Sequence, residues 1–132
     1  MPAKRVCGEL QQLGRIVMDL DVTWERKHGV LIAVLAGRID GNNAEVLQDT
    51  LEFGIGPEES ALILDFEQVT FISSAGLRVG VIIAWKFKDP GKQFGVCTLT
   101  DPVREVITIS GFDQIIDIYA SQAEAIKAFE DN

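Results

Sequence analysis

The sequence predicts an α/β domain, with a mixed sheet of four to five strands flanked by about four helices. From about residue 21, short apolar segments typical of strands alternate with segments of helical spacing. This alternation indicates an open sheet with crossover helices. The first two strand segments, 22–29 and 30–37, are joined directly by a turn at Lys27, His28 and Gly29. They therefore form a hairpin, and the sheet should be mixed.

The remaining elements follow in chain order, each marked by its own boundary residues. Predicted strands cover 61–66, 93–99 and 115–119, and predicted helices cover 44–54, 74–89, 101–111 and a last segment from 121. The turn 40–43 offers N-cap side chains to the first helix. Asp101 and Pro102 open the third helix, and Ser121 with Glu124 forms a capping box for the fourth.

The chain length fits one domain, because 132 residues can bury a single core. We expect residues 1–20 to form an extension and 21–132 to form the domain. In the extension, Leu10, Leu13, Val17 and Leu20 have the spacing of a short amphipathic helix. The net charge of −8 disfavours nucleic acid and anionic membrane surfaces as partners.

The two cysteines, Cys7 and Cys97, have no CxxC spacing and no histidine at metal-ligand spacing. They are therefore expected to be free thiols in a reducing compartment. The N-terminus lacks the continuous apolar stretch of a signal peptide, and no window approaches a membrane span. Together these observations predict a cytoplasmic protein.

The segment 74–89 is predicted to be a helix that turns one face to the core. At about 100° per residue, one arc collects Gly76, Leu77, Val79, Gly80, Ile83, Ala84 and Phe87. Gly76 and Gly80 lie near the middle of this arc. A missing side chain there would let the helix approach the sheet closely, despite a helix-propensity cost of roughly 1 kcal/mol for each glycine.

The opposite arc of this helix, which we call the outer stripe, combines charged and apolar side chains. It consists of Ser74, Ala75, Arg78, Val81, Ile82 and Trp85, and is flanked by Lys86 and Lys88. Exposed apolar residues beside an arginine indicate a binding surface, because tryptophan and arginine are over-represented among binding hot spots. The alternative is that another element of the domain, such as the extension, covers the stripe.

Two adjacent serines, Ser73 and Ser74, stand at the start of this helix. One is expected to cap it, by accepting a hydrogen bond from a free amide of the first turn. A cap accounts for one serine only. The other hydroxyl could accept a phosphate of charge about −1.5 to −2 at the positive helix end. Such a dianion would stand in the middle of the Arg78, Ile82 and Trp85 patch and would expel a bound partner.

The sequence disfavours an enzyme. A serine nucleophile needs a base, yet the only histidine, His28, falls in a predicted hairpin turn, and no GxSxG motif occurs. The phosphate-binding patterns GxGxxG and GxxxxGK[ST] are also missing, so nucleotide hydrolysis is disfavoured, and no cofactor is expected. Asp40 and Asp65 lie near strand ends, but two acids alone do not make a metal site. Cap or turn roles are expected for both.

The segment LILDFEQVTFISSAGLRVGVII, residues 62–83, resembles the signature of STAS domains of the anti-sigma factor antagonist type. Residues 35–51, LAGRIDGNNAEVLQDTL, and residues 109–129, ISGFDQIIDIYASQAEAIKAF, agree with the same family. The resemblance covers about residues 21 to 130. It implies a mixed sheet flanked by helices, in agreement with the elements derived above.

The resemblance implies a regulator that works by partner switching. In the family, the unphosphorylated protein binds an anti-sigma factor that is also a serine kinase of the GHKL type, so that the sigma factor is released. The kinase phosphorylates the antagonist, and a metal-dependent phosphatase of the PP2C type resets it. By position, the acceptor is Ser74. Ser73 replaces an aspartate of many members and is a second candidate acceptor.

The resemblance also places Asp40 near the kinase-binding edge, and we expect the turn 40–43, Ser74 and the outer stripe to lie side by side. The turn and the stripe together give the expected partner-binding residues, which are Asp40, Gly41, Asn42, Asn43, Ala75, Arg78, Val81, Ile82 and Trp85. Two alternatives to partner switching stay open. In one, the domain senses a small ligand or nucleotide without being phosphorylated. In the other, it serves as a scaffold without being phosphorylated. The sequence also leaves open whether the extension makes the protein a homodimer.

Overall fold

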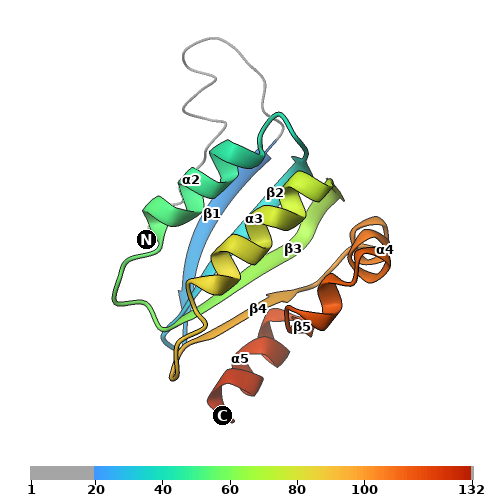
Figure 1. Cartoon of the computed structure of the whole chain (residues 1–132). Coiled ribbons are helices and arrows are strands. Elements are labelled where there is room, and N and C mark those ends of the chain that lie inside the picture. The colour runs from blue at the N-terminus through green and yellow to red at the C-terminus, as the bar shows by residue number, and fades with distance from the viewer. Residues whose placement is uncertain (1–19, 132) are drawn as a thin grey trace.

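The structure is a computed structural model, and it describes residues 20–131 (Figure 1). Its elements are, in order, β1 (Leu20–Lys27), β2 (Val30–Ile39), α2 (Ala44–Gly54), β3 (Ala61–Ile72), α3 (Ser74–Trp85), β4 (Gln93–Cys97), α4 (Asp101–Ser110), a 3-10 helix η1 (Phe112–Gln114), β5 (Ile118–Tyr119) and α5 (Gln122–Glu130). The helix expected around Leu10, Leu13 and Val17 lies outside the described residues. Leu20, which was assigned to that helix, is the first residue of β1.

The five strands form one mixed sheet in the order β1-β2-β3-β4-β5. β1 and β2 are antiparallel, and the pairs from β2 to β5 are parallel. The turn of the hairpin lies at His28 and Gly29, both with positive φ, of 52° and 78°. Such angles match the twist of tight hairpins. The predicted α/β class and the mixed sheet are confirmed.

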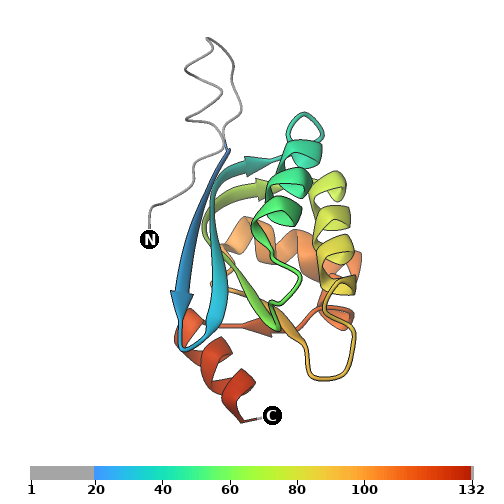
Figure 2. The ribbon, with the colours of Figure 1, turned by 90° about the vertical axis from the view of Figure 1, so that its left-hand side faces the viewer.

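The helices cover the two faces of the sheet unequally. α2 and α3 lie side by side on one face, and α4 packs on the same face beside β3 (Figures 1 and 2). α5 covers part of the other face, where Ala125, Ile126 and Phe129 pack on β2, β3 and β4. Because β2 and β3 are parallel and are each followed by a helix on the same face, α2 and α3 begin at the same end of the sheet. This end also holds the serines.

β3 is longer than the sequence predicts, since it spans residues 61–72 and not 61–66. Its first part is buried between β2 and β4, which explains why residues 61–66 are apolar except for Asp65. Its second part pairs with β2 alone and exposes Glu67, Gln68 and Thr70. Because these side chains are polar, the second part of β3 does not form an apolar run in the sequence. Register shifts between Val34 and Ala36, and between Gly37 and Arg38, bend the pairing there.

α3 ends at Trp85, four residues before its predicted end at Asp89. The amides of Lys86 and Phe87 donate to the carbonyls of Ile83 and Ala84, so that each bond spans three residues and tightens the last turn. Phe87 thereby reaches the core, where its ring lies 6.1 Å from that of Phe94. The predicted core arc is confirmed, with Gly80 and Ala84 partly buried and its other members buried.

The two core-facing glycines of α3 differ. A Cβ on Gly76 would lie 2.6 Å from Cγ2 of Ile39 and 2.8 Å from Cγ1 of Ile72, so a glycine is needed for this close approach. A Cβ on Gly80 would meet Ile116 at 3.8 Å, an ordinary contact. The expected close approach is therefore correct at Gly76 and wrong at Gly80.

The helix starts also differ in part from the predicted caps. Ser121 accepts from the amide of Glu124 at 3.1 Å, as expected. The N-cap residue of α4 is Thr100 and not Asp101, which is the first helical residue. The hydroxyl of Thr100 donates to the carbonyl of Val69 at 2.8 Å, so it ties α4 to β3. Helix ends are defined only to within one or two residues, so a sequence pattern can place the cap one residue away.

Candidate functional site

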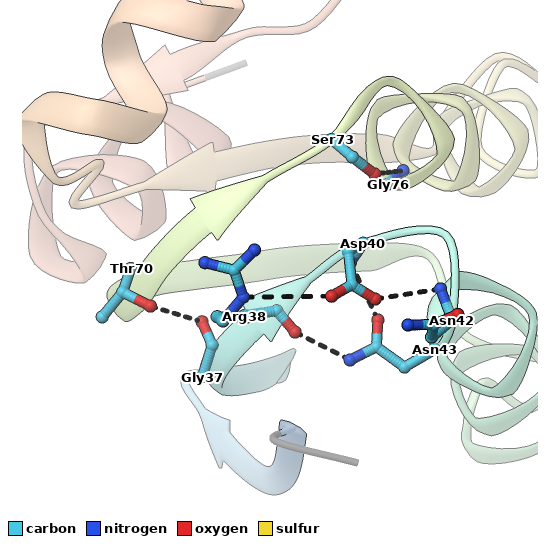
Figure 3. A network of polar contacts seen from close by, with 8 residues as sticks. All are labelled: Gly37, Arg38, Asp40, Asn42, Asn43, Thr70, Ser73 and Gly76. Carbon is cyan, nitrogen blue, oxygen red and sulfur yellow. Dashed lines mark hydrogen bonds and ion pairs between the residues drawn. The ribbon is translucent and has the colours of Figure 1, made fainter.

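The junction between β3 and α3 gives the two serines different roles. Ser73 is extended, with φ −95° and ψ 175°, and is the N-cap of α3. Its Oγ accepts from the amide of Gly76 at 3.3 Å (Figure 3). Its own amide donates to the carbonyl of Ile39 at 2.9 Å, and its carbonyl accepts from Leu77. Ser73 is therefore the capping serine, and its hydroxyl is engaged.

Ser74 is the first residue of α3, and its side chain is exposed. Among residues 20–131, no side chain or carbonyl forms a hydrogen bond with its hydroxyl. The first turn of α3 carries no acidic residue. Because the unpaired amides at a helix start attract negative charge, this position can hold an anionic group on Ser74 without nearby acidic repulsion from its own turn.

The turn 40–43 is held by its own side chains (Figure 3). Oδ1 of Asp40 accepts from the amide of Asn42 at 2.9 Å. Asn43, which is only 3% exposed, accepts from the amide of Asp40 and donates to the carbonyl of Arg38, at 3.0 and 2.8 Å. The Asn43 side chain therefore closes the turn and does not cap α2. Such bonding fixes the loop in one conformation.

The arginine before this turn is also positioned. The guanidinium of Arg38 lies 4.4 Å from the centre of the Phe71 ring, and its Nε is 3.9 Å from Oδ2 of Asp40. The side chain of Arg38 is about half exposed. Stacking of this kind contributes about 0.5–1 kcal/mol at exposed sites. No sequence pattern indicates this role of Arg38, since only the pairing of β2 with β3 brings Phe71 next to it.

The turn 40–43 and the serines lie side by side, as expected. The bond from the amide of Ser73 to the carbonyl of Ile39 joins the end of β2 to the end of β3. Asp40 follows Ile39 directly, and Ser74 follows Ser73. The parallel pairing of the two strands thus brings two segments more than 30 residues apart to one edge of the sheet.

The outer stripe runs along the whole of α3. Arg78 and Trp85 are exposed, Trp85 to 62%, while Ala75, Val81 and Ile82 are half-buried. Ser74 stands at the beginning of the stripe. Trp85 lies eleven residues later, about 16 Å away at ~1.5 Å per residue. The expectation that a phosphate would stand in the middle of the patch is therefore wrong. It would stand at one end, one turn from Arg78.

The polar groups elsewhere do not extend this site. His28 lies at the other end of β2, a strand that spans about 30 Å at ~3.3 Å per residue, and its Nδ1 is 3.7 Å from Glu130. It cannot act as a base for Ser74. Asp65 is buried and accepts from the amide of Glu67 and from Gln122. Within residues 20–131, no cluster of three or more acidic, histidine or cysteine side chains could hold a metal.

Cys97 is a buried free thiol, and Cys7 lies outside the described residues. Burial raises the pKa of Cys97 to about 11, so the thiol stays protonated at neutral pH. A protonated thiol is a poor nucleophile. No helix in the described part of the chain is long and apolar enough to cross a membrane.

The fold and site define a class of α/β domains in which an exposed helix start lies beside a fixed loop. The STAS domain family matches residues 21–125, and the chain belongs to this family. Its homologues include the "Putative anti-sigma factor antagonist BtrV" of Bordetella bronchiseptica, which is 35% identical over 84% of this chain and 96% of the relative. The anti-sigma F factor antagonist of Paenibacillus polymyxa is 27% identical over 86% of this chain and 97% of that protein.

Solved structures show the same fold. An anti-sigma factor antagonist from Mycobacterium paratuberculosis superposes with a TM-score of 0.74 at 24% identity, covering 84% of this chain and 94% of that one. The unphosphorylated form of the anti-sigma factor antagonist SpoIIAA gives a TM-score of 0.69 at 18% identity, over 84% and 97% of the two chains. At these identities the likeness concerns the fold alone.

Proposed function

We propose that this protein is a cytoplasmic, non-enzymatic anti-sigma factor antagonist that acts by partner switching. When unphosphorylated, it binds an anti-sigma factor that is a serine kinase of the GHKL type. The kinase transfers the γ-phosphoryl group of ATP to Oγ of Ser74. The hydroxyl loses its proton, a new P–O bond forms, and ADP leaves. A PP2C-type phosphatase hydrolyses the ester and restores binding.

The observation that carries this proposal is the exposed hydroxyl of Ser74, which has no hydrogen-bond partner among the described residues. Ser73, in contrast, is half-buried and its Oγ already caps α3. Modifying Ser73 would remove a cap that contributes about 0.5–2 kcal/mol to stability. Ser74 is therefore the acceptor that the geometry favours, with Ser73 as the weaker second candidate.

The docking surface in this proposal consists of the turn 40–43 together with the outer stripe. Because the loop is fixed and the helix is rigid, docking on this surface requires little further loss of conformational entropy. A phosphate on Ser74 would lie one helical turn from Arg78, at the spacing of an i,i+4 pair. It would therefore place a bulky dianion at the end of the docking surface and also engage the guanidinium that the partner would otherwise contact. Both effects weaken docking while leaving the fold intact.

The test is phosphorylation by the GHKL-type kinase encoded in the same genome, with the phosphate located by mass spectrometry. Label is expected at Ser74, absent from Ser74→Ala and retained in the matched control Ser73→Ala. Label that survives Ser74→Ala would refute the assignment. If Ser74→Asp bound every partner as tightly as the wild type, the protein would be a scaffold and not a switch.

A further inference from the structure

A surface groove of about 490 Å³ lies at the end of α3 opposite to Ser74. Its walls come from the end of α3 and the loop after it, from β4, from the η1–β5 segment and from α5. The volume falls within the range of about 300–1,000 Å³ that is typical of small-molecule sites. We call it the Trp85 groove.

The walls of the Trp85 groove are rich in aromatic rings. Trp85 and Ile115 stand at its sides, exposed to 62% and 61%. Phe94 lines it from β4, and Tyr119 and Phe129 meet edge to face with their ring centres 6.1 Å apart. Aromatic faces favour stacked or edge contacts with another ring. The groove therefore suits a ligand with a flat aromatic body.

The charge of the groove is unusual for this acidic chain. Lys88 and Lys92 both line it, in a protein of net charge −8. Within residues 20–131, neither ammonium group pairs with a carboxylate. Nζ of Lys92 lies 5.9 Å from the centre of the Phe87 ring, so it stays beside the aromatic wall. Unpaired ammonium groups beside an apolar wall are suited to an anionic ligand group.

One acidic residue, Asp117, also lines the groove, so the groove has a negative part as well as a positive one. An anionic ligand would avoid this carboxylate and turn its charged end toward Lys88 and Lys92. Burial, followed by the charge of Asp117, raises the pKa of Tyr119, so this phenol carries no charge at neutral pH. The two lysines thus outnumber the one charged carboxylate among the lining side chains.

We propose that the Trp85 groove binds a small organic anion with an aromatic body, its ring between Trp85 and the β4–β5 wall and its charge beside Lys88 and Lys92. The groove shares Trp85 with the proposed docking surface, but it lies at the opposite end of α3 from the proposed phosphate acceptor. Ser74 lies about 16 Å away along α3 at ~1.5 Å per residue, beyond the Debye length of about 8 Å at physiological ionic strength. Binding in the groove should therefore be independent of phosphorylation, and the inference does not rest on the proposed function.

The test uses 1-naphthylacetate as the probe and 1-naphthylmethylamine as a cation with the same ring. Calorimetry and NMR titration of the full chain should show saturable one-to-one binding of the acetate, with a Kd below about 1 mM. The amine should bind at least tenfold more weakly. Trp85→Ala and the Lys88→Gln/Lys92→Gln double variant should each weaken acetate binding at least fivefold.

Three matched variants serve as controls. Ile109→Ala removes another exposed apolar side chain, 81% exposed on α4, and Lys127→Gln removes a lysine of α5 that lies outside the groove. Both should bind the acetate like the wild type, and so should Ser74→Asp. The proposal is overturned if no saturable binding occurs up to about 1 mM, if the amine binds equally well, or if the groove variants bind normally. None of these results would alter the kinase assay at Ser74.

Discussion

The amide of Ser73 donates a 2.9 Å hydrogen bond to the carbonyl of Ile39, and this bond holds the start of α3 against the turn 40–43. Ile39 also contributes to the close approach at Gly76, where a Cβ would lie 2.6 Å from its Cγ2. The helix start is therefore fixed both by hydrogen bonding and by packing. Ser74 follows Ser73 directly, so the start of α3 presents the exposed hydroxyl of Ser74 to a partner on a fixed backbone.

The two serines should differ in their contributions to stability. Ser73→Ala removes the acceptor for the amide of Gly76 and should lower the free energy of unfolding by about 1 kcal/mol. Ser74→Ala removes an exposed hydroxyl without a partner among residues 20–131, and should change it by less than about 0.5 kcal/mol. Urea unfolding of both variants measures the difference. Equal losses would show that the cap is assigned to the wrong residue.

The two glycines of α3 give a second matched pair. Gly76→Ala should destabilise the protein, because its methyl group would overlap Ile39 and Ile72, at a cost of about 1–3 kcal/mol. Gly80→Ala should be neutral or stabilising by up to about 1 kcal/mol, since the helix gains propensity and the methyl group has room. Thermal and urea unfolding test both. A destabilised Gly80→Ala variant would contradict the packing described for α3.

Trp85 should matter for binding more than for folding. The side chain is 62% exposed, so Trp85→Ala should cost little stability. If the kinase docks along the outer stripe, the same change should weaken its binding by about 2 kcal/mol, as at other tryptophan hot spots. Calorimetry with the kinase and urea unfolding separate these effects. A large loss of stability with unchanged binding would mean that Trp85 is a core residue.

Cys97 should make stability depend on pH in the alkaline range. Its folded pKa is about 11, whereas an unfolded cysteine has a pKa of about 8.5. Between these values the unfolded chain releases a proton that the folded chain retains, so the free energy of unfolding falls as pH rises. Below about pH 8.5 the thiol is protonated in both states, so it no longer makes the free energy of unfolding depend on pH. The stability difference between the wild type and Cys97→Ala, measured from pH 8 to 11, should shrink accordingly; a constant difference would exclude this linkage.

Patterns within one segment predicted much of the fold. The hairpin, the alternation of strands and helices, and the core arc of α3 each depend on neighbouring residues, and each is confirmed. The end of α3 was placed too late because the docking of Phe87 against Phe94 tightens its last turn. The length of β3 was missed because its second part is covered on one side only, and its polar residues broke the apolar run.

The site was predictable in part for the same reason. Ser73, Ser74 and the outer stripe lie within one segment, so the helical spacing could place them. The stripe was defined by the angle of each residue around the helix axis. Such angles do not include distance along the axis, and this distance places Ser74 at one end of the stripe. The stacking of Arg38 on Phe71 and the Trp85 groove depend on contacts between distant strands and helices. These contacts leave no pattern in a single segment.

The most direct test of partner switching compares the affinity of the kinase for the unphosphorylated protein and for the protein phosphorylated at Ser74. Calorimetry should show that phosphorylation weakens binding at least tenfold, which corresponds to about 1.4 kcal/mol, while circular dichroism and urea unfolding show an intact fold. Equal affinities of the two forms would contradict the switch, even if Ser74 proved to be the residue that carries the phosphate.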